Sequence, residues 1–271
     1  MSDPVSLGDD VLAYYGENVE ADRLSVGTGA LEFERAKELL ARFLPARSAV
    51  ADVGGAFGHY ADWLARDGHR VELVEPVPLH VEVARERAGE PARFGVQLGD
   101  ARALPFADAS FDAVLLLGPL YHLGEARDRV QAAREAARIC RSGGLVFAAA
   151  ISRFAPLLDA IRRGRIGEAQ LFANVLAETE SGRRVQAERR TSPFPDAYFH
   201  RPTELAAELA AAGLDVAGVY GLEGPGWLQA DFAVAWQDEH ARPRILEAAR
   251  ATELDPDIRA ASAHLLAVAR K

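Results

Sequence analysis

The sequence predicts an α/β fold built on a doubly wound, mostly parallel sheet with helices on both faces. Between residues 45 and 151, short apolar runs alternate with amphipathic segments of helical periodicity, which is the pattern of β-α-β units. The runs 111–117 and 145–151 are almost wholly apolar, as strands covered on both faces are. Glycines follow several of these runs, where the chain would turn from strand to helix.

The composition is that of a globular chain with a sizeable core. Of 271 residues, 49% are hydrophobic and 26% are charged. The single cysteine, Cys140, excludes a disulfide framework and a multi-cysteine metal site, and no metal is expected. Because Cys140 lies in an apolar segment predicted to be helical, we expect it to pack as a small hydrophobic residue.

Charge and hydropathy limit the partners. The net charge of −9 argues against general nucleic-acid binding and against an acidic membrane surface. Arginines cluster at 162–165 and 183–190, which we interpret as solvated faces, although a local anion-binding patch stays open. No window is long and apolar enough to span a membrane, and the first residues lack a signal-peptide pattern. These features predict a soluble, cytoplasmic protein, either a monomer or a homodimer.

The elements of the core follow in order along the chain. A helical segment over 9–44 ends at Pro45 and forms an N-terminal helical cap, 1–44. The ligand-binding core is predicted over 45–151. Its strands are expected at 49–53, 70–74, 94–98, 111–117 and 145–151, and its helices at 59–66, 79–88 and 128–140.

The alternation breaks down after residue 151. Residues 152–200 mix helical and polar pieces and are interpreted as a lid insertion over the sheet. The remainder, 201–271, is expected to complete the core with a helix over 201–212, a strand over 214–220 and a helical insertion at 222–260. The segment 263–269 fits a helix or a strand, and a strand is favoured because strand 214–220 needs a partner in the sheet.

The most informative motif runs from Val50 to Gly58. Asp52 ends the first strand, and Gly54 and Gly55 then lead through Gly58 into a helix. Glycines let a backbone approach a ligand closely, and the helix N-terminus offers free N–H groups. The spacing does not fit the dinucleotide fingerprint, because positions 56 and 59 are alanine and histidine.

Further motifs follow at the ends of later strands. Each places an acid, a glycine or a turn where the carboxyl edge of a parallel sheet would bind a ligand. They are Glu75-Pro76, which lies 23 residues after Asp52, then Gly99-Asp100-Ala101, Leu104-Pro105-Phe106 with Ser110-Phe111-Asp112-Ala113-Val114, and Arg141-Ser142-Gly143-Gly144.

This ordered set resembles the class I S-adenosylmethionine-dependent methyltransferases, whose signature is Asp-x-Gly-x-x-x-Gly. The resemblance covers 45–151 closely and extends loosely beyond. It implies a seven-stranded, Rossmann-like sheet with its last strand antiparallel, and S-adenosyl-L-methionine as cofactor. The chain departs from the family at Gly55, where Cys or Ala is common, and at Ala56-Phe57, where Gly-Pro or Gly-Thr is common.

The resemblance also implies roles for individual residues. Glu75 would accept hydrogen bonds from both ribose hydroxyls, Asp100 would bind the adenine amino group, and the Ala101 amide would meet a ring nitrogen. In related small-molecule enzymes the N-terminal helix closes over the donor, which implies cofactor contacts for Tyr15 and Arg23. The full predicted cofactor set is Tyr15, Arg23, Asp52, Gly54, Gly55, Gly58, Glu75, Pro76, Asp100, Ala101, Leu117 and Gly118.

The reacting centre is expected just past the fourth strand. Methyl transfer from a sulfonium needs alignment and exclusion of water, and an O–H or N–H acceptor also needs a proton sink. His122 titrates near neutral pH and is the candidate base, with Tyr121 beside it. Both side chains would alternatively only shape the pocket. His200 is a second candidate base, or a cap of the following helix.

The leading hypothesis is an enzyme that methylates O or N of a small organic molecule. Aromatic residues concentrated in the insertions would line an apolar acceptor pocket or form the core of the lid. Two alternatives stay open: a transfer-RNA methyltransferase, which the acidic charge disfavours, and a catalytically silent methyltransferase-like binding protein. A nicotinamide-dependent reductase is disfavoured because the third fingerprint glycine is missing.

Overall fold

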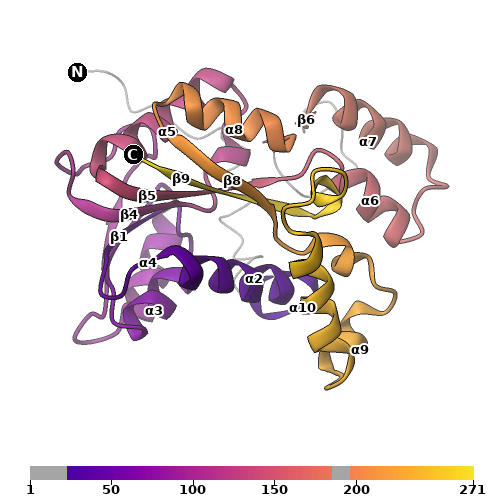
Figure 1. The fold of residues 1–271 in the computed structure, drawn as a ribbon, viewed down its shortest axis with the longest axis horizontal. Helices are drawn as coiled ribbons and strands as arrows, with labels where there is room; N and C mark the ends of the chain where they lie inside the picture. The colour runs from indigo at the N-terminus through magenta and orange to yellow at the C-terminus, as the bar shows by residue number, and fades with distance from the viewer. Residues whose placement is uncertain (1–22, 185–195) are drawn as a thin grey trace.

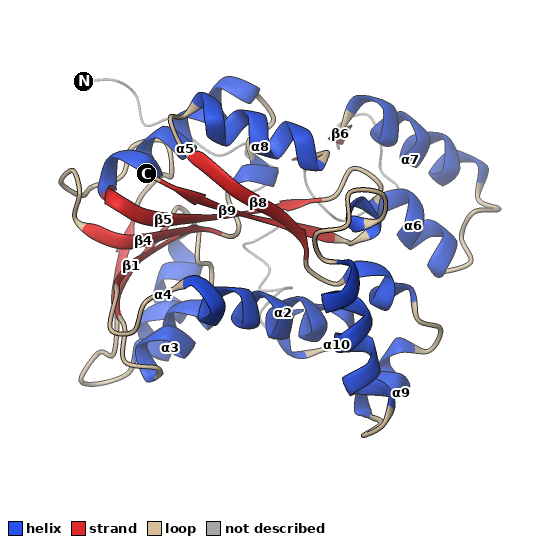
Figure 2. Cartoon of the chain, in the orientation of Figure 1, coloured by secondary structure: helices blue, strands red, loops and turns tan. Residues whose placement is uncertain are grey.

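The computed structural model describes residues 23–184 and 196–271, and its centre is one seven-stranded sheet (Figures 1 and 2). The strand order is β3-β2-β1-β4-β5-β9-β8. All neighbours pair in parallel except β9, which runs antiparallel to both β5 and β8. The strands are β1 (Ala49–Val53), β2 (Arg70–Glu75), β3 (Gly95–Leu98), β4 (Phe111–Leu116), β5 (Cys140–Ile151), β8 (Asp215–Gly221) and β9 (His264–Arg270).

Helices cover both faces of this sheet, as the apolar strands require. One face packs against α5 (Ala126–Ile139) and α8 (Pro202–Ala211), and the other against α2 (Gly27–Phe43), α3 (His59–Arg66) and α4 (Pro78–Ala88). Figure 2 shows these two helical layers on either side of the strands. The doubly wound, mostly parallel fold predicted from the sequence is therefore confirmed.

The order of the strands reverses at β1. From β1 the chain moves to β2 and β3 on one side, and then returns to β4 and β5 on the other. The loops after β1 and β4 leave the carboxyl edge of the sheet toward opposite faces. Such a switch point leaves a crevice between the two loops, which is where open α/β sheets bind their ligands.

Further elements follow β5 and β8 in the chain. The segment predicted to be a lid contains two helices and a short two-stranded sheet among its described residues, and the segment between β8 and β9 adds further helices (Figure 1). These elements are α6 (Ala155–Arg162), α7 (Ala169–Ser181), β6 (Arg183–Arg184), β7 (Ala197–Tyr198), η4 (Gly224–Leu228), α9 (Phe232–Gln237) and α10 (Ala241–Thr252). The proposed division of the chain into cap, core, lid and C-terminal part stays a prediction.

Two local expectations have clear outcomes. The segment 263–269 is a strand, β9, and it provides the partner that β8 needs. Cys140 is buried as expected, but it is the first residue of β5 and not part of a helix. The preceding helix α5 ends at Ile139, and Cys140 pairs with Phe111 of β4. None of the helices within residues 23–184 and 196–271 is long and apolar enough to cross a membrane.

Candidate cofactor and active site

Two glycine turns meet at the switch point. Gly54, after β1, has φ of +69°, and a Cβ atom there would lie 2.9 Å from Cδ of Pro119. Gly118, after β4, is equally restricted, because its Cβ would lie 2.6 Å from the carbonyl oxygen of Gly54. Only glycine allows this approach, so both loops require it and together they form one wall of the crevice.

Ala56, where the sequence departs from the family, lies in the turn between β1 and α3. Ala56 has φ of +46°, a left-handed conformation that favours glycine. Gly58, with φ of +76°, is the N-cap of α3. Ala56 therefore adopts the backbone that a glycine would take, at some conformational cost, and the turn still delivers the chain to the start of α3.

Glu75 is held in place at the end of β2. Its side chain is almost fully buried, and one carboxylate oxygen accepts a hydrogen bond from the Ala56 amide at 3.0 Å. The other oxygen accepts one from the Val77 amide at 3.1 Å and lies 3.1 Å from Nδ1 of His80. A carboxylate accepts about four bonds. Glu75 is thus fixed in orientation and retains acceptor capacity toward the pocket.

Asp52 is a buried acid at the end of β1. It is completely inaccessible, and neither carboxylate oxygen has a hydrogen-bond partner of good geometry among the described residues. Burial, together with repulsion from Glu75, raises the pKa of Asp52 to about 7, against a small opposing effect of the Ala61 amide. A buried acid with little to stabilise its charge is unusual, and such groups concentrate at functional sites.

We expect Asp52→Asn to stabilise the ligand-free protein at alkaline pH. Because the pKa of Asp52 is raised in the folded protein, its contribution to the free energy of unfolding depends on pH. This contribution is fully present below about pH 3.8 and is lost as the pH rises through about 7. The shift corresponds to at most about 4 kcal/mol at pH 8. Since a buried amide also costs free energy, we expect a net gain of about 1–2 kcal/mol.

Thermal and urea unfolding between pH 5 and pH 8.5 measure this effect. The stability difference between Asp52→Asn and the parent should grow as the pH rises. The matched control is Asp257→Asn, because Asp257 is exposed on the surface. A difference that stays constant with pH, or that shrinks as the pH rises, would show that Asp52 is not protonated in the folded protein near neutrality.

Asp100 is held by a neighbouring arginine. Arg102 donates to both carboxylate oxygens, from Nε at 2.9 Å and from Nη2 at 2.6 Å, and its own amide donates at 2.8 Å. This fork fixes the carboxylate next to Ala101 in the third-strand loop. An adenine amino group would therefore have to share oxygens that Arg102 already binds.

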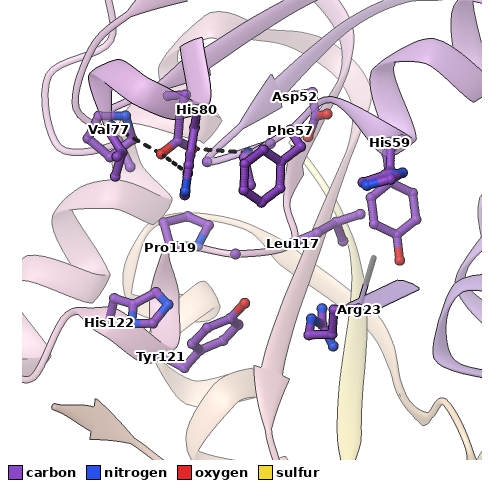
Figure 3. Close-up of a pocket in the computed structure, with 18 of the residues that line it drawn as sticks. Arg23, Asp52, Phe57, His59, Val77, His80, Leu117, Pro119, Tyr121 and His122 are labelled. Carbon is purple, nitrogen blue, oxygen red and sulfur yellow. Dashed lines mark hydrogen bonds and ion pairs between the residues drawn. The ribbon is translucent and has the colours of Figure 1, made fainter. Parts of the chain in front are cut away.

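These groups line one pocket at the carboxyl edge of the sheet. It contains most of the side chains predicted for the cofactor and the reaction. They are Arg23, Asp52, Gly54, Gly55, Glu75, Pro76, Asp100, Ala101, Leu117, Gly118, Tyr121 and His122. Figure 3 shows Tyr121 and His122 on one side of Pro119, with Phe57 and His80 on the other. The Tyr121 and His122 rings make an edge-to-face contact at 4.5 Å.

Two described residues of the predicted set, Gly58 and His200, are not in the lining. Gly58 caps α3 behind the loop, and its own Cβ position faces the ring of Phe94. Tyr15 lies outside the described residues. His200 is completely buried elsewhere, where its Nε2 lies 3.2 Å from a carboxylate oxygen of Glu208. The backbone of His200 forms a β-bridge with Ser152, just past the end of β5, and its ring contacts Glu208 of α8. His200 thus joins β5 to α8.

The pocket also contains residues that the sequence did not single out. Phe57 and His80 pack ring against ring at 4.4 Å, and Val77 and His59 complete the wall. His80 is the fifth residue after Glu75, inside α4, so only the helical turn brings it back to the acid. The five-residue spacing between Glu75 and His80 could have predicted this contact, but only if the start of α4 at Pro78 had been known.

The fold and this site define a class of protein, which comparison with known sequences identifies. Residues 51–148 match the methyltransferase domain family. An ubiquinone biosynthesis O-methyltransferase of Xanthomonas axonopodis pv. citri (strain 306) is 30% identical over 204 residues, covering 73% of this chain and 75% of that protein. The chain therefore belongs to the class I S-adenosylmethionine-dependent methyltransferases.

Other relatives match over shorter regions. Methyltransferase GfsG of Streptomyces halstedii is 40% identical over 99 residues, which cover 35% of this chain and 34% of GfsG. The chain spans 57% of a second ubiquinone biosynthesis O-methyltransferase, from Methylocella silvestris. A probable tRNA methyltransferase 9B of Bos taurus is 34% identical over 97 residues, 36% of this chain and 20% of that protein.

Solved structures agree on the fold. The putative methyltransferase bound to the Haloferax volcanii Trm112 methyltransferase activator superposes with a TM-score of 0.60 at 20% identity, covering 98% of this chain and 99% of that entity. At this level of identity the likeness concerns the fold alone.

Proposed function

We propose that the protein transfers a methyl group from S-adenosylmethionine to an oxygen or nitrogen atom of a small organic molecule. One observation supports this most directly. The oriented, buried carboxylate of Glu75 faces a pocket whose wall is the paired glycine turns of Gly54 and Gly118. A nucleoside cofactor needs a ribose acceptor and a close backbone, and this arrangement provides both.

The residues present fit the cofactor of the family. Glu75 would accept the ribose hydroxyls, and Ala101 and Asp100 would face the adenine ring. The Gly54 and Gly118 turns pack against each other so closely that a Cβ atom on either would clash with the other loop, and they present backbone to the pocket. Asp52 is completely buried and also borders the pocket. When bound, S-adenosylmethionine supplies an activated methyl group on a positively charged sulfur.

The chain's own groups would align the acceptor and receive its proton. In this proposal His122 takes the proton from the acceptor hydroxyl or amine, and Tyr121 packs against the imidazole and orients it. Both follow β4 in a short 3₁₀ turn, Leu120–His122. The helices α6 and α7 belong to the proposed lid, whose part would be to exclude water from the reacting atoms.

A transfer-RNA substrate is the alternative, and the tRNA methyltransferase relatives favour it. The match to the Bos taurus protein covers 97 residues, 36% of this chain. The net charge of −9 opposes it, because phosphate backbones bind cationic surfaces. Salt-dependent binding of unfractionated transfer RNA at micromolar affinity would decide for this alternative and against a small-molecule acceptor.

Isothermal titration calorimetry tests the proposal. We expect S-adenosylhomocysteine to bind and NAD not to bind, because the glycine spacing does not fit the dinucleotide fingerprint. Release of S-adenosylhomocysteine in the presence of phenol and amine acceptors then tests transfer. Tight NAD binding without binding of the sulfur ligand would refute the proposal, and binding without release for any acceptor would favour a catalytically silent binding protein.

A further inference from the structure

A second cavity, of about 390 Å³, lies next to the candidate cofactor pocket. Its floor is formed by Ile151 at the end of β5 and by His264 at the start of β9. Leu117, in the cofactor pocket, directly follows β4, which pairs in parallel with β5. Leu24 lines the first cavity, and Thr28, four residues later, lines the second. The two cavities therefore occupy neighbouring positions along the same edge of the sheet.

The inner wall of the second cavity is apolar. It is formed by Leu171 and Val175 of α7, by Phe199 beside β7, and by Trp227 of the 3₁₀ turn η4. Val175, Phe199 and Trp227 are almost completely buried against the rest of the protein. Such a wall suits the apolar or aromatic body of a small molecule.

The charged side chains of the lining are mainly cationic. They include Arg163, Arg165 and Arg184, against Asp159 as the one carboxylate among the described lining residues. Two of these arginines pair with glutamates outside the lining: Arg165 with Glu168, and Arg184 with Glu178. Arg163 pairs with Asp159 inside the lining. The three guanidinium groups outnumber the one carboxylate of the lining, and they favour an anion.

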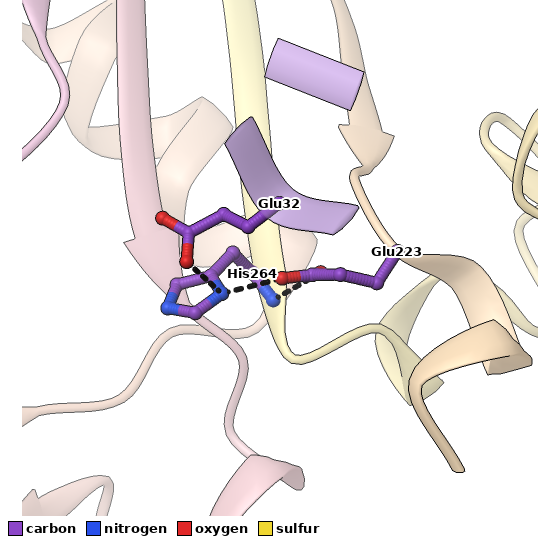
Figure 4. Close-up of side chains that lie close together, drawn as sticks. All are labelled: Glu32, Glu223 and His264. Carbon is purple, nitrogen blue, oxygen red and sulfur yellow. Dashed lines mark hydrogen bonds and ion pairs between the residues drawn. The ribbon is translucent and has the colours of Figure 1, made fainter. Parts of the chain in front are cut away.

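His264 lines the cavity beside two carboxylates. Figure 4 shows its ring between the carboxylates of Glu32 and Glu223. Nδ1 lies 2.6 Å from Glu223 and 3.5 Å from Glu32. Burial alone lowers the pKa of His264, but the two carboxylates more than offset this and raise it above the ordinary histidine value.

The same cluster connects the two cavities. Glu32 also accepts hydrogen bonds from both terminal nitrogens of Arg23, which lines the cofactor pocket. Glu223 accepts from the Ser262 hydroxyl and from the His264 amide. Both carboxylates therefore already accept hydrogen bonds from donors of this chain. The cluster holds His264 in place, with Arg23 at the cofactor pocket and His264 at the second cavity.

We propose that this second cavity binds the methyl acceptor, and that the acceptor is a small molecule with an apolar body and a carboxylate group. The inference rests on the proposed function. The apolar wall would hold the body of the molecule, and the arginines would bind its carboxylate through charge-assisted hydrogen bonds. The acceptor atom would then lie on the side of the cavity that faces the cofactor pocket, which Leu117 and His122 line.

Calorimetry on the protein saturated with S-adenosylhomocysteine tests this with benzoate and benzamide, which share their shape and differ in charge. We expect benzoate to bind at least about tenfold more tightly than benzamide. In the double variant Arg163→Gln/Arg165→Gln, this preference should fall to about threefold or less. Both side chains are largely exposed, so the variant should keep the parent melting temperature within a few degrees.

Arg162→Gln is the matched control. Arg162 lies next to Arg163 and binds the same Asp159, but it does not line the cavity. It should keep the full preference for benzoate. Equal binding of the two probes, no binding of benzoate at about 10 mM, or an unchanged preference in the double variant would each overturn the inference.

Two further outcomes separate the possible failures. Inorganic phosphate that displaces benzoate at a lower concentration than acetate does would overturn the assignment to a carboxylate. Binding of S-adenosylhomocysteine without selective binding of benzoate would overturn this inference and leave the proposed function intact. Absence of S-adenosylhomocysteine binding would overturn both.

Discussion

His122→Ala is expected to lower methyl-transfer turnover by about 10²- to 10⁴-fold, the range that a positioned general base contributes. The affinity for S-adenosylhomocysteine should change little, because the lost interaction would be one made in the transition state. In the parent enzyme, turnover should fall as the pH is lowered through the near-neutral range in which an imidazole becomes protonated. That acidic limb should vanish in the variant.

The matched control is His59→Ala, since His59 is a second imidazole in the lining of the same pocket, at the start of α3. It should retain the acidic limb whatever its effect on binding. Weaker cofactor binding in His122→Ala with nearly normal turnover at saturation would mean that His122 only shapes the pocket. If the acidic limb persists in His122→Ala, the group whose protonation lowers turnover is not His122 but the substrate or another residue.

Glu75→Ala is expected to weaken binding of S-adenosylhomocysteine by about 10²-fold or more. Two charge-assisted hydrogen bonds to the ribose would be lost, each worth at most about 1.5–3 kcal/mol. The Ala56 and Val77 amides would lose their acceptor as well, which loosens the loop after β1. Calorimetry on the purified variants measures the affinity directly.

Glu72→Ala serves as the control for this change. Glu72 lies on the same strand, β2, but outside the lining of the cofactor pocket. It should bind S-adenosylhomocysteine as the parent does. An unchanged affinity in Glu75→Ala would show that Glu75 is not the ribose acceptor and that its role is to hold the loop.

The sequence was most informative for residues whose position in the fold depends only on the order of the strands. Asp52, Glu75 and Asp100 each lie at or just past the carboxyl end of a parallel strand, and these ends meet at one edge of the sheet. Their assembly into one pocket could therefore be predicted without any side-chain packing. The β9 strand could be predicted in the same way, because β8 required a partner.

The residues that were missed depend on packing between elements. His80 reaches Glu75 only because α4 starts at Pro78, and Arg102 holds Asp100 only because the loop turns back on itself. The position of His200 illustrates the same point. In the sequence, His200 follows aromatic residues and could be a catalytic base. In the structure, β7 pairs with β6 and His200 forms a β-bridge with Ser152, and its side chain is buried against Glu208.

The place of β9 has a consequence for how the chain folds. β8 has β9 as its neighbour in the sheet, and β9 lies between β5 and β8. The ribosome synthesises β8 roughly 50 residues before β9. Until β9 is made, β8 lacks its native partner strand, and the edge of β5 is open. Such non-local pairing slows folding and exposes strand edges to aggregation. Deleting residues 264–270 would thus remove β9, leave β8 without a neighbour in the sheet, and make β5 an open edge.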